Sequence, residues 1–177
     1  MIVFTYRLMR AALLDASVYE EIERDRSAGW QALAVVLLSS LAAGLGSAGW
    51  RGPELSVQVS VTAMALVTWA AWAVLVLQIG GRWLSESATR VDMGELLRTV
   101  GFAAAPGLLQ VFAALPAVTL GVYVVTWIWM FAAMVVAIRQ ALDYATTLHA
   151  VAVCAVALSL SLGLAFLLGV LLGPTVG

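Results

Sequence analysis

The chain has 177 residues, of which 63% are hydrophobic and only 11% are charged, whereas about 25% are charged in a typical soluble domain. A soluble protein of this size could not cover so much apolar surface, but a protein embedded in a bilayer has no need to. The formal net charge of −1 lacks the basic excess of nucleic-acid-binding proteins, so no nucleic-acid partner is expected.

Residues 1–29 are predicted to form a helical collar on the cytoplasmic side of the membrane. The stretch FTYRLMRAALL places its apolar side chains on one helical face and two arginines, Arg7 and Arg10, on another. This pattern is typical of a helix that lies at a membrane interface. No cleavable signal peptide is expected, because an acidic cluster follows instead of an apolar core with a small-residue cleavage site.

The stretch SVYEEIERDR predicts a second collar helix. Ser17 followed by Glu20 fits a capping box, and Glu20 with Arg24 forms an i,i+4 pair in the favourable orientation. Tyr19 and Ile22 share one face, which is expected to rest on the membrane or on other cytoplasmic segments. No metal site is expected here, since arginines interleave with the acids and no glycine turn is present.

Five apolar stretches follow, each near the length of about 20 residues that a bilayer core of about 30 Å requires. The sequence therefore predicts an all-α fold, an integral membrane bundle of five transmembrane helices occupying residues 30–177. The predicted spans are 30–50, 56–80, 95–116, 119–138 and 148–172.

The third and fourth spans are predicted to form a helical hairpin, and a re-entrant pair that does not cross is the alternative. Asp92 is expected to cap the third helix, with Glu95 three residues on. Pro106 is expected to kink this helix and Pro116 to end it.

Arginine placement predicts the orientation. With five spans, eight of the nine arginines fall on the side of the amino terminus and only Arg51 falls on the other. Because cytoplasmic segments carry the excess of basic residues, we expect a bacterial inner-membrane protein with a cytoplasmic amino terminus and an outside carboxyl terminus. The three arginines of the 81–99 loop also suggest anionic lipid at the cytoplasmic surface.

No charged residue lies within the apolar core of any span, which disfavours a proton relay or a buried ion site. Gln110 is one of the few polar groups at depth and marks the possible path of a small neutral or lipophilic solute. His149, the only histidine, could ligate a porphyrin or chlorin, although an interfacial histidine hydrogen-bonded to a loop is the simpler interpretation. No catalytic motif is present, and no enzyme activity, cofactor or metal is expected.

Small residues recur four apart, as in Gly169 with Gly173 and Ala42 with Gly46. Such pairs let helices approach closely. They predict close packing within the bundle, or contact with a second copy or another membrane protein.

Three segments, YEEIERD, LLRTVGFAAAP and IWMFAAMVVAIRQALDYATTLHAV, resemble the Yip-domain family of Ypt/Rab-interacting five-span membrane proteins, in their prokaryotic branch. The resemblance implies five helices and a cytoplasmic amino terminus. In eukaryotes the family works in vesicle trafficking, through small GTPases, membrane proteins and membrane shape. The Asp-Leu-x-Gly-Pro motif of those members does not occur in this sequence, so GTPase binding is not carried over.

The leading functional prediction is a non-enzymatic scaffold or accessory subunit that organises a membrane assembly or membrane shape. A solute channel or carrier and a pigment-binding subunit are the alternatives. Arg139 and Asp143, four apart, are expected to pair on a helix that extends the fourth span. The residues expected to carry interactions or architecture are Tyr19, Glu20, Glu23, Arg24, Gly101, Pro106, Arg139, Asp143, Gly169 and Gly173.

Overall fold

The computed structural model describes residues 2–83 and 92–172, and every regular element within those ranges is a helix. In chain order the elements are α1 (Ile2–Ala12), α2 (Ala16–Arg24), α3 (Ala28–Gly46), α4 (Ala48–Arg51), α5 (Leu55–Gln78), the π-helix η1 (Ile79–Trp83), α6 (Met93–Phe102), the 3₁₀-helix η2 (Ala105–Ala114), α7 (Thr119–Ala141) and α8 (Thr147–Leu172).

Four helical segments are long and apolar enough to cross a membrane. They are Ala28–Trp50, Leu55–Gly81, Met93–Ala114 and Thr119–Ala141. Within α8, the described side chains add a shorter apolar helix, Thr147–Ser161. The predicted all-helical membrane bundle is therefore confirmed, while the crossing of α8 as a fifth span stays a prediction.

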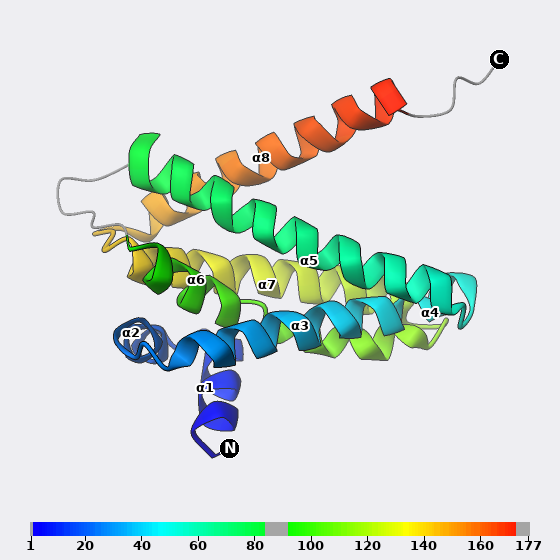
Figure 1. Cartoon of the computed structure of the whole chain (residues 1–177), viewed down its shortest axis with the longest axis horizontal. Helices are drawn as coiled ribbons and strands as arrows, with labels where there is room; N and C mark the ends of the chain where they lie inside the picture. Colours follow the sequence, from blue (N-terminus) through cyan, green and yellow to red (C-terminus); the bar gives the residue numbers. More distant parts are fainter. Residues whose placement is uncertain (1, 84–91, 173–177) are drawn as a thin grey trace.

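The bundle is built around α3 and the segment formed by α6 and η2, which run side by side. α5 packs along α3, α7 packs on η2, and α8 meets the bundle near its own first turns (Figure 1). The collar helices α1 and α2 pack beneath one end of the bundle, against α6, η2 and α7. Val18, Tyr19 and Ile22 of α2 are fully buried there, so collar and bundle share one hydrophobic core.

The third span is two helices rather than the single kinked helix that was predicted over 95–116. α6 ends at Phe102, and a 3₁₀-helix begins at Ala105 with Pro106 in its first turn. Proline supplies no N–H and its ring excludes the preceding carbonyl, so the regular α-helical ladder stops before it. The predicted cap is confirmed, since the Asp92 carboxylate accepts from the backbone N–H of Gly94 at 2.6 Å and of Glu95 at 3.1 Å.

The predicted capping box at Ser17 is wrong. Asp15 caps α2, and its Oδ1 accepts from the backbone N–H of Ser17 at 3.0 Å. The reason lies in the preceding turn. Leu14 adopts a left-handed φ of 62°, which lets the Asp15 N–H donate to the Arg10 carbonyl at 3.1 Å. This Schellman-type turn ends α1 so tightly that α2 begins earlier than the sequence pattern indicates.

The predicted helical extension of the fourth span is also wrong. α7 ends at Ala141, and Asp143 takes a left-handed φ of 51°. The Tyr144 N–H donates to the Arg139 carbonyl at 3.0 Å, again as in a Schellman turn. Arg139 and Asp143 are therefore not on one helix face, and these two described side chains form no ion pair; Arg139 donates instead to the Thr147 hydroxyl at 3.2 Å.

The described small residues serve packing inside the bundle. A Cβ on Gly46 would overlap the backbone carbonyl oxygen of Gln110, and a Cβ on Gly101 would lie 2.8 Å from the Cβ of Ala32. These glycines therefore bring α3 into close contact with η2 and α6. Gly169 lies in α8, and Gly173 falls outside the described residues, so the predicted Gly169–Gly173 contact remains a prediction.

Candidate functional site

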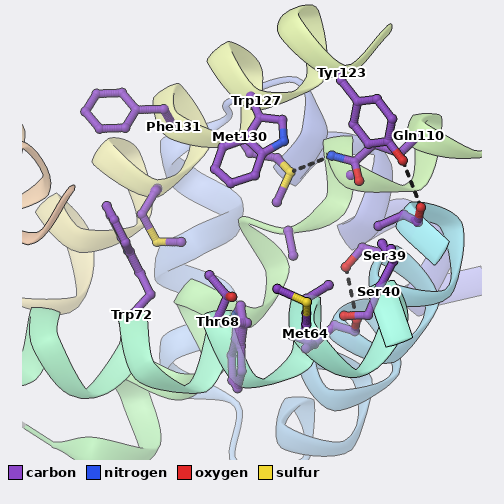
Figure 2. Close-up of a pocket in the computed structure, with 18 of the residues that line it drawn as sticks. Ser39, Ser40, Met64, Thr68, Trp72, Gln110, Tyr123, Trp127, Met130 and Phe131 are labelled. Atoms are coloured by element: carbon purple, nitrogen blue, oxygen red, sulfur yellow. Dashed lines mark hydrogen bonds between the residues drawn. The ribbon is translucent and has the colours of Figure 1, made fainter. Parts of the chain in front are cut away.

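A pocket of about 620 Å³ lies within the membrane bundle, between α3, α5, η2 and α7, and we call it the membrane pocket. Figure 2 shows its polar side chains gathered at one end, where Ser39, Ser40, Gln110 and Tyr123 converge. Phe131 lies toward the other end. Among the described residues that line the pocket, none carries a charge.

Gln110, the predicted marker of a solute path, is buried in the wall of this pocket. Its amide nitrogen donates to the Thr126 hydroxyl at 3.3 Å and contacts the Met130 sulfur at 3.8 Å. The Thr126 hydroxyl itself donates to the Val122 carbonyl at 2.8 Å, so toward Gln110 it can only accept. This fixes the orientation of the amide. Transport through the pocket stays a prediction.

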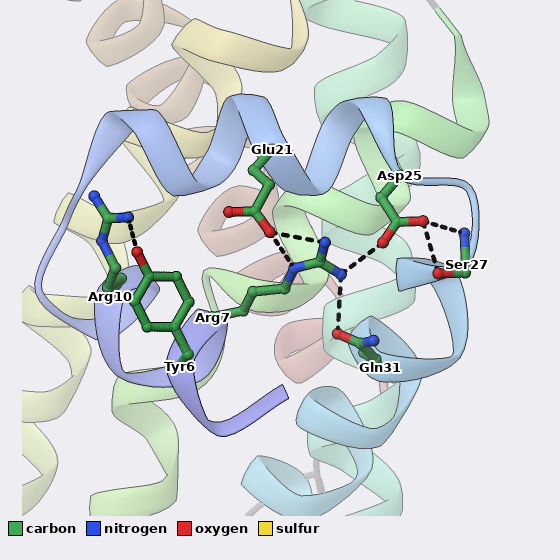
Figure 3. A network of polar contacts seen from close by, with 7 residues as sticks. All are labelled: Tyr6, Arg7, Arg10, Glu21, Asp25, Ser27 and Gln31. Carbon is green, nitrogen blue, oxygen red and sulfur yellow. Dashed lines mark hydrogen bonds and ion pairs between the residues drawn. The ribbon is translucent and has the colours of Figure 1, made fainter. Parts of the chain in front are cut away.

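The collar is held together by Arg7, which has only 5% of its surface exposed. Figure 3 shows its guanidinium between the carboxylates of Glu21 and Asp25, both at 2.8 Å, with the Gln31 side-chain oxygen at 3.3 Å. The sequence placed Arg7 on the polar face of an interfacial helix, and the structure encloses that face at Arg7 within the protein. The physical reason is that α2 and the start of α3 fold over α1 and supply partners for the buried charge.

Besides the Arg7–Gln31 bond, three hydrogen bonds between described residues join the collar to α6 and α7. The Trp129 indole N–H of α7 donates to the Ala12 carbonyl at 2.7 Å. Arg98 of α6 donates to the Glu23 carbonyl at 2.6 Å, and the Gln140 amide donates to the Glu20 carboxylate at 3.0 Å. The collar is therefore held in place by direct contacts with α6 and α7.

A second pocket of about 280 Å³ opens where α2 meets the end of α7, and we call it the collar cleft. Its described lining residues are mainly charged: Glu20, Glu23, Arg24, Arg139, Gln140, Asp143 and Tyr144. Arg24 contacts Glu20 at 3.4 Å, as predicted from their i,i+4 spacing. The cleft thus brings together residues more than 110 positions apart in the chain, with both signs of charge at its rim.

Glu23 has the most altered acidity in the cleft. Partial burial, together with the nearby negative charges of Asp143 and Glu95, raises the pKa of the Glu23 carboxyl from 4.5 to about 7. The charge of Arg24 opposes this shift in pKa without cancelling it. Glu23 therefore changes charge close to neutral pH, in a cleft whose other acids face it.

The predicted site residues fall into two groups. Glu20, Glu23, Arg24, Arg139 and Asp143 all line the collar cleft. The others have internal positions: the Tyr19 hydroxyl donates to the Ala11 carbonyl at 3.2 Å, and Gly101 and Pro106 are buried in the third span.

His149 lies outside both pockets. It is exposed at the start of α8, and its ring packs against Tyr144 with 5.5 Å between ring centroids. Its backbone N–H donates to the Thr146 hydroxyl at 3.4 Å. Its role as an interfacial histidine and its use as a porphyrin or chlorin ligand both stay predictions.

Sequence reasoning missed Gln140 and Tyr144 in the collar cleft, and Ser39 and Ser40 in the membrane pocket. The Tyr144 hydroxyl donates to the Gly80 carbonyl at 2.9 Å, tying the cleft to the end of α5. The only local signal was the pair of adjacent serines in an otherwise apolar span, because polar groups at membrane depth are often functional.

The apolar helices, the shared core and the uncharged interior define a multi-pass membrane protein with an attached polar collar. A model of the Yip1 domain matches residues 13–169. The chain therefore belongs to the Yip1 domain family, as its resemblance in sequence implied. No curated protein and no solved structure matches the chain.

Proposed function

We propose that this protein is a non-enzymatic scaffold or accessory subunit of the bacterial cytoplasmic membrane, with its collar in the cytoplasm, and that it docks a partner at the collar cleft. The observation that carries this proposal is the cleft itself, formed jointly by α2 and the end of α7. The partner would be another integral membrane protein, or a second copy, presenting a polar segment with both signs of charge. Anionic lipid headgroups at the same face would add a non-specific contact.

Two features of the cleft suit docking. Arg24 has 79% of its side chain exposed, and Arg139 and Asp143 are exposed as well, so charges are available to a partner. The backbone that presents them is fixed by the bonds from Arg98 and Gln140 to the collar. A preformed surface loses less conformational entropy on binding than a mobile one, and complementary charges orient the partner.

The test is a gentle purification of the tagged full chain from its native membrane, comparing wild type with Arg139→Glu and Arg139→Ala. We expect Arg139→Glu to remove a stoichiometric partner, because the substitution reverses a charge in the cleft. Arg139→Ala should lower assembly or abundance. The matched control is Arg26→Glu, an exposed charge of the collar outside the cleft lining. Full partner recovery with Arg139→Glu, or equal loss with Arg26→Glu, would contradict the proposal.

A further inference from the structure

The membrane pocket contains polar groups that the described chain leaves unpaired. Ser40 has only 4% of its surface exposed and lines the pocket, yet no partner for its hydroxyl lies within hydrogen-bonding distance among the described residues. The side-chain oxygen of Gln110 also has no hydrogen-bond partner among the described residues, since Thr126 and Met130 contact only the side-chain nitrogen. Because polar groups away from water are nearly always hydrogen-bonded, these two groups in the pocket wall are the ones that an occupant would pair with.

The wall also offers donors. The indole N–H groups of Trp69 and Trp72, both on the α5 side of the pocket, are enclosed and meet no acceptor in the described part of the chain. The Tyr123 hydroxyl donates to the Ala43 carbonyl at 2.9 Å and keeps its own oxygen free to accept. The pocket therefore presents both acceptors and donors, as a hydroxyl-bearing ligand requires.

The remaining lining defines the rest of the ligand. The described lining residues include no acid or base, so a charged headgroup would enter without a counter-ion, at a large desolvation cost. Beyond the polar end the wall is formed by apolar side chains such as Phe131 and Met134. A volume of about 620 Å³ is within the range of small-ligand sites, about 300–1,000 Å³.

A ligand of the membrane pocket would reach it from the bilayer. α5 is the least buried of the four long apolar segments, and exposed apolar side chains of α5 and α7, Met64 at 68% and Ile128 at 67%, belong to the pocket lining. Their surroundings in a membrane protein are lipid chains. The pocket is thus reached from the side, from within the membrane.

We propose that the membrane pocket binds a neutral single-chain lipid, whose hydroxyl-bearing headgroup meets Gln110 and Ser40 and whose chain runs toward Phe131 and Met134. The lipid enters laterally past Met64 and Ile128. Its hydroxyl donates to the Gln110 oxygen, and its oxygens accept from Ser40. This is a binding site, and it is independent of partner docking at the collar cleft.

The experiment uses the full chain in phosphatidylcholine nanodiscs and a photoactivatable, alkyne-tagged monoacylglycerol as the probe. We expect saturable labelling of peptides from α3, α5 or α7. Unlabelled monoolein should compete about tenfold better than oleate, which has the same chain and a charged head. A tenfold difference in affinity corresponds to the free energy of about one hydrogen bond. Non-saturable labelling, or equal competition by oleate, would overturn the proposal.

Two variants locate the site. Thr68→Trp places a large ring in the pocket from an exposed position, and Val67→Trp, 70% exposed and outside the lining, is its matched control. Thr68→Trp should abolish saturable labelling while Val67→Trp retains it. Gln110→Leu should weaken monoolein competition about tenfold. If Thr68→Trp does not fold, Met64→Trp replaces it. Labelling at the wild-type level in whichever of these two variants folds would refute the site.

Discussion

At the scale of single residues, the collar depends on charges placed at two different depths. Arg7 is almost enclosed and has two carboxylate partners and an amide, whereas Arg24 is exposed and meets one carboxylate at 3.4 Å. Both arginines pair with a glutamate of α2, yet their energetic roles differ. The difference lies in burial, because water screens an exposed pair and cannot replace the partners of an enclosed one.

Arg7→Lys should lower stability measurably. A lysine keeps the charge but cannot contact Glu21, Asp25 and Gln31 at once, because its ammonium lacks the guanidinium fork. We expect a loss of about 1.5–3 kcal/mol, the usual contribution of a charged hydrogen bond. Thermal unfolding in detergent, followed by tryptophan fluorescence, measures the effect. Arg24→Lys is the control and should change the midpoint little; equal midpoints for the two variants would contradict this assignment of roles.

The acidity of Glu23 predicts a pH dependence of stability. Its pKa is higher in the folded protein, about 7, than the ordinary value of 4.5, so the folded state binds the proton more tightly than the unfolded state does. The Glu23 contribution therefore favours folding at low pH and is lost as pH rises from 4.5 to about 7.

Glu23→Gln should remove this dependence. We expect the variant to have a higher unfolding temperature than wild type at pH 8 and nearly the same temperature at pH 5. Thermal scans of both proteins across this range measure it. Glu20→Gln, a change in the same cleft at a more exposed carboxylate, serves as the control. An identical pH profile for wild type and Glu23→Gln would show that Glu23 titrates normally.

At the scale of helices, apolar length was the informative signal. The predicted spans 30–50, 119–138 and 148–172 correspond closely to Ala28–Trp50, α7 and α8, because a bilayer demands a helix of a set length. Helix ends were predicted less well. The helices α1 and α7 end in turns where Leu14 and Asp143 adopt a left-handed conformation. Glycine usually marks such a turn, and neither position carries one.

Gly46→Ala should separate α3 from η2. In an exposed helix a Gly-to-Ala change stabilises the folded protein by about 1 kcal/mol. Here the added methyl group would overlap the backbone carbonyl oxygen of Gln110. We expect a net loss of about 1–3 kcal/mol, typical of overpacking. The unfolding midpoint in detergent measures it. Gly121→Ala in α7, where a Cβ meets nothing within 4 Å, should be neutral or stabilising; a loss as large there would rule out the packing explanation.

At the scale of the whole molecule, the sequence predicted the class of fold and most of the collar cleft. Charged residues must lie outside the bilayer core, so Glu20, Glu23, Arg24, Arg139 and Asp143 were all expected near the membrane surface. The loop connections then bring the collar and the end of α7 to the same end of the bundle (Figure 1).

The membrane pocket was not predictable in the same way. It depends on how far apart four helices pack, and hydropathy says nothing about spacing between helices. Gln110 could be singled out because it is polar and deep, but the convergence of Ser40 and Tyr123 on it depends on helix rotation. The burial of Arg7 was missed for a similar reason, since its partners lie 14 to 24 residues away in sequence.

The break in the third span has a consequence for how the chain enters the membrane. A segment inserted alone into lipid must satisfy its backbone groups by itself, and this one does so less completely than an unbroken α-helix, because its α-helix stops at Phe102 and Pro106 cannot donate to a carbonyl of the preceding turn. It is also the most buried and least apolar of the four candidate spans. Because the segment packs on both α3 and α7, we expect its stable insertion to depend on these neighbours, with the third and fourth segments entering the membrane as one unit.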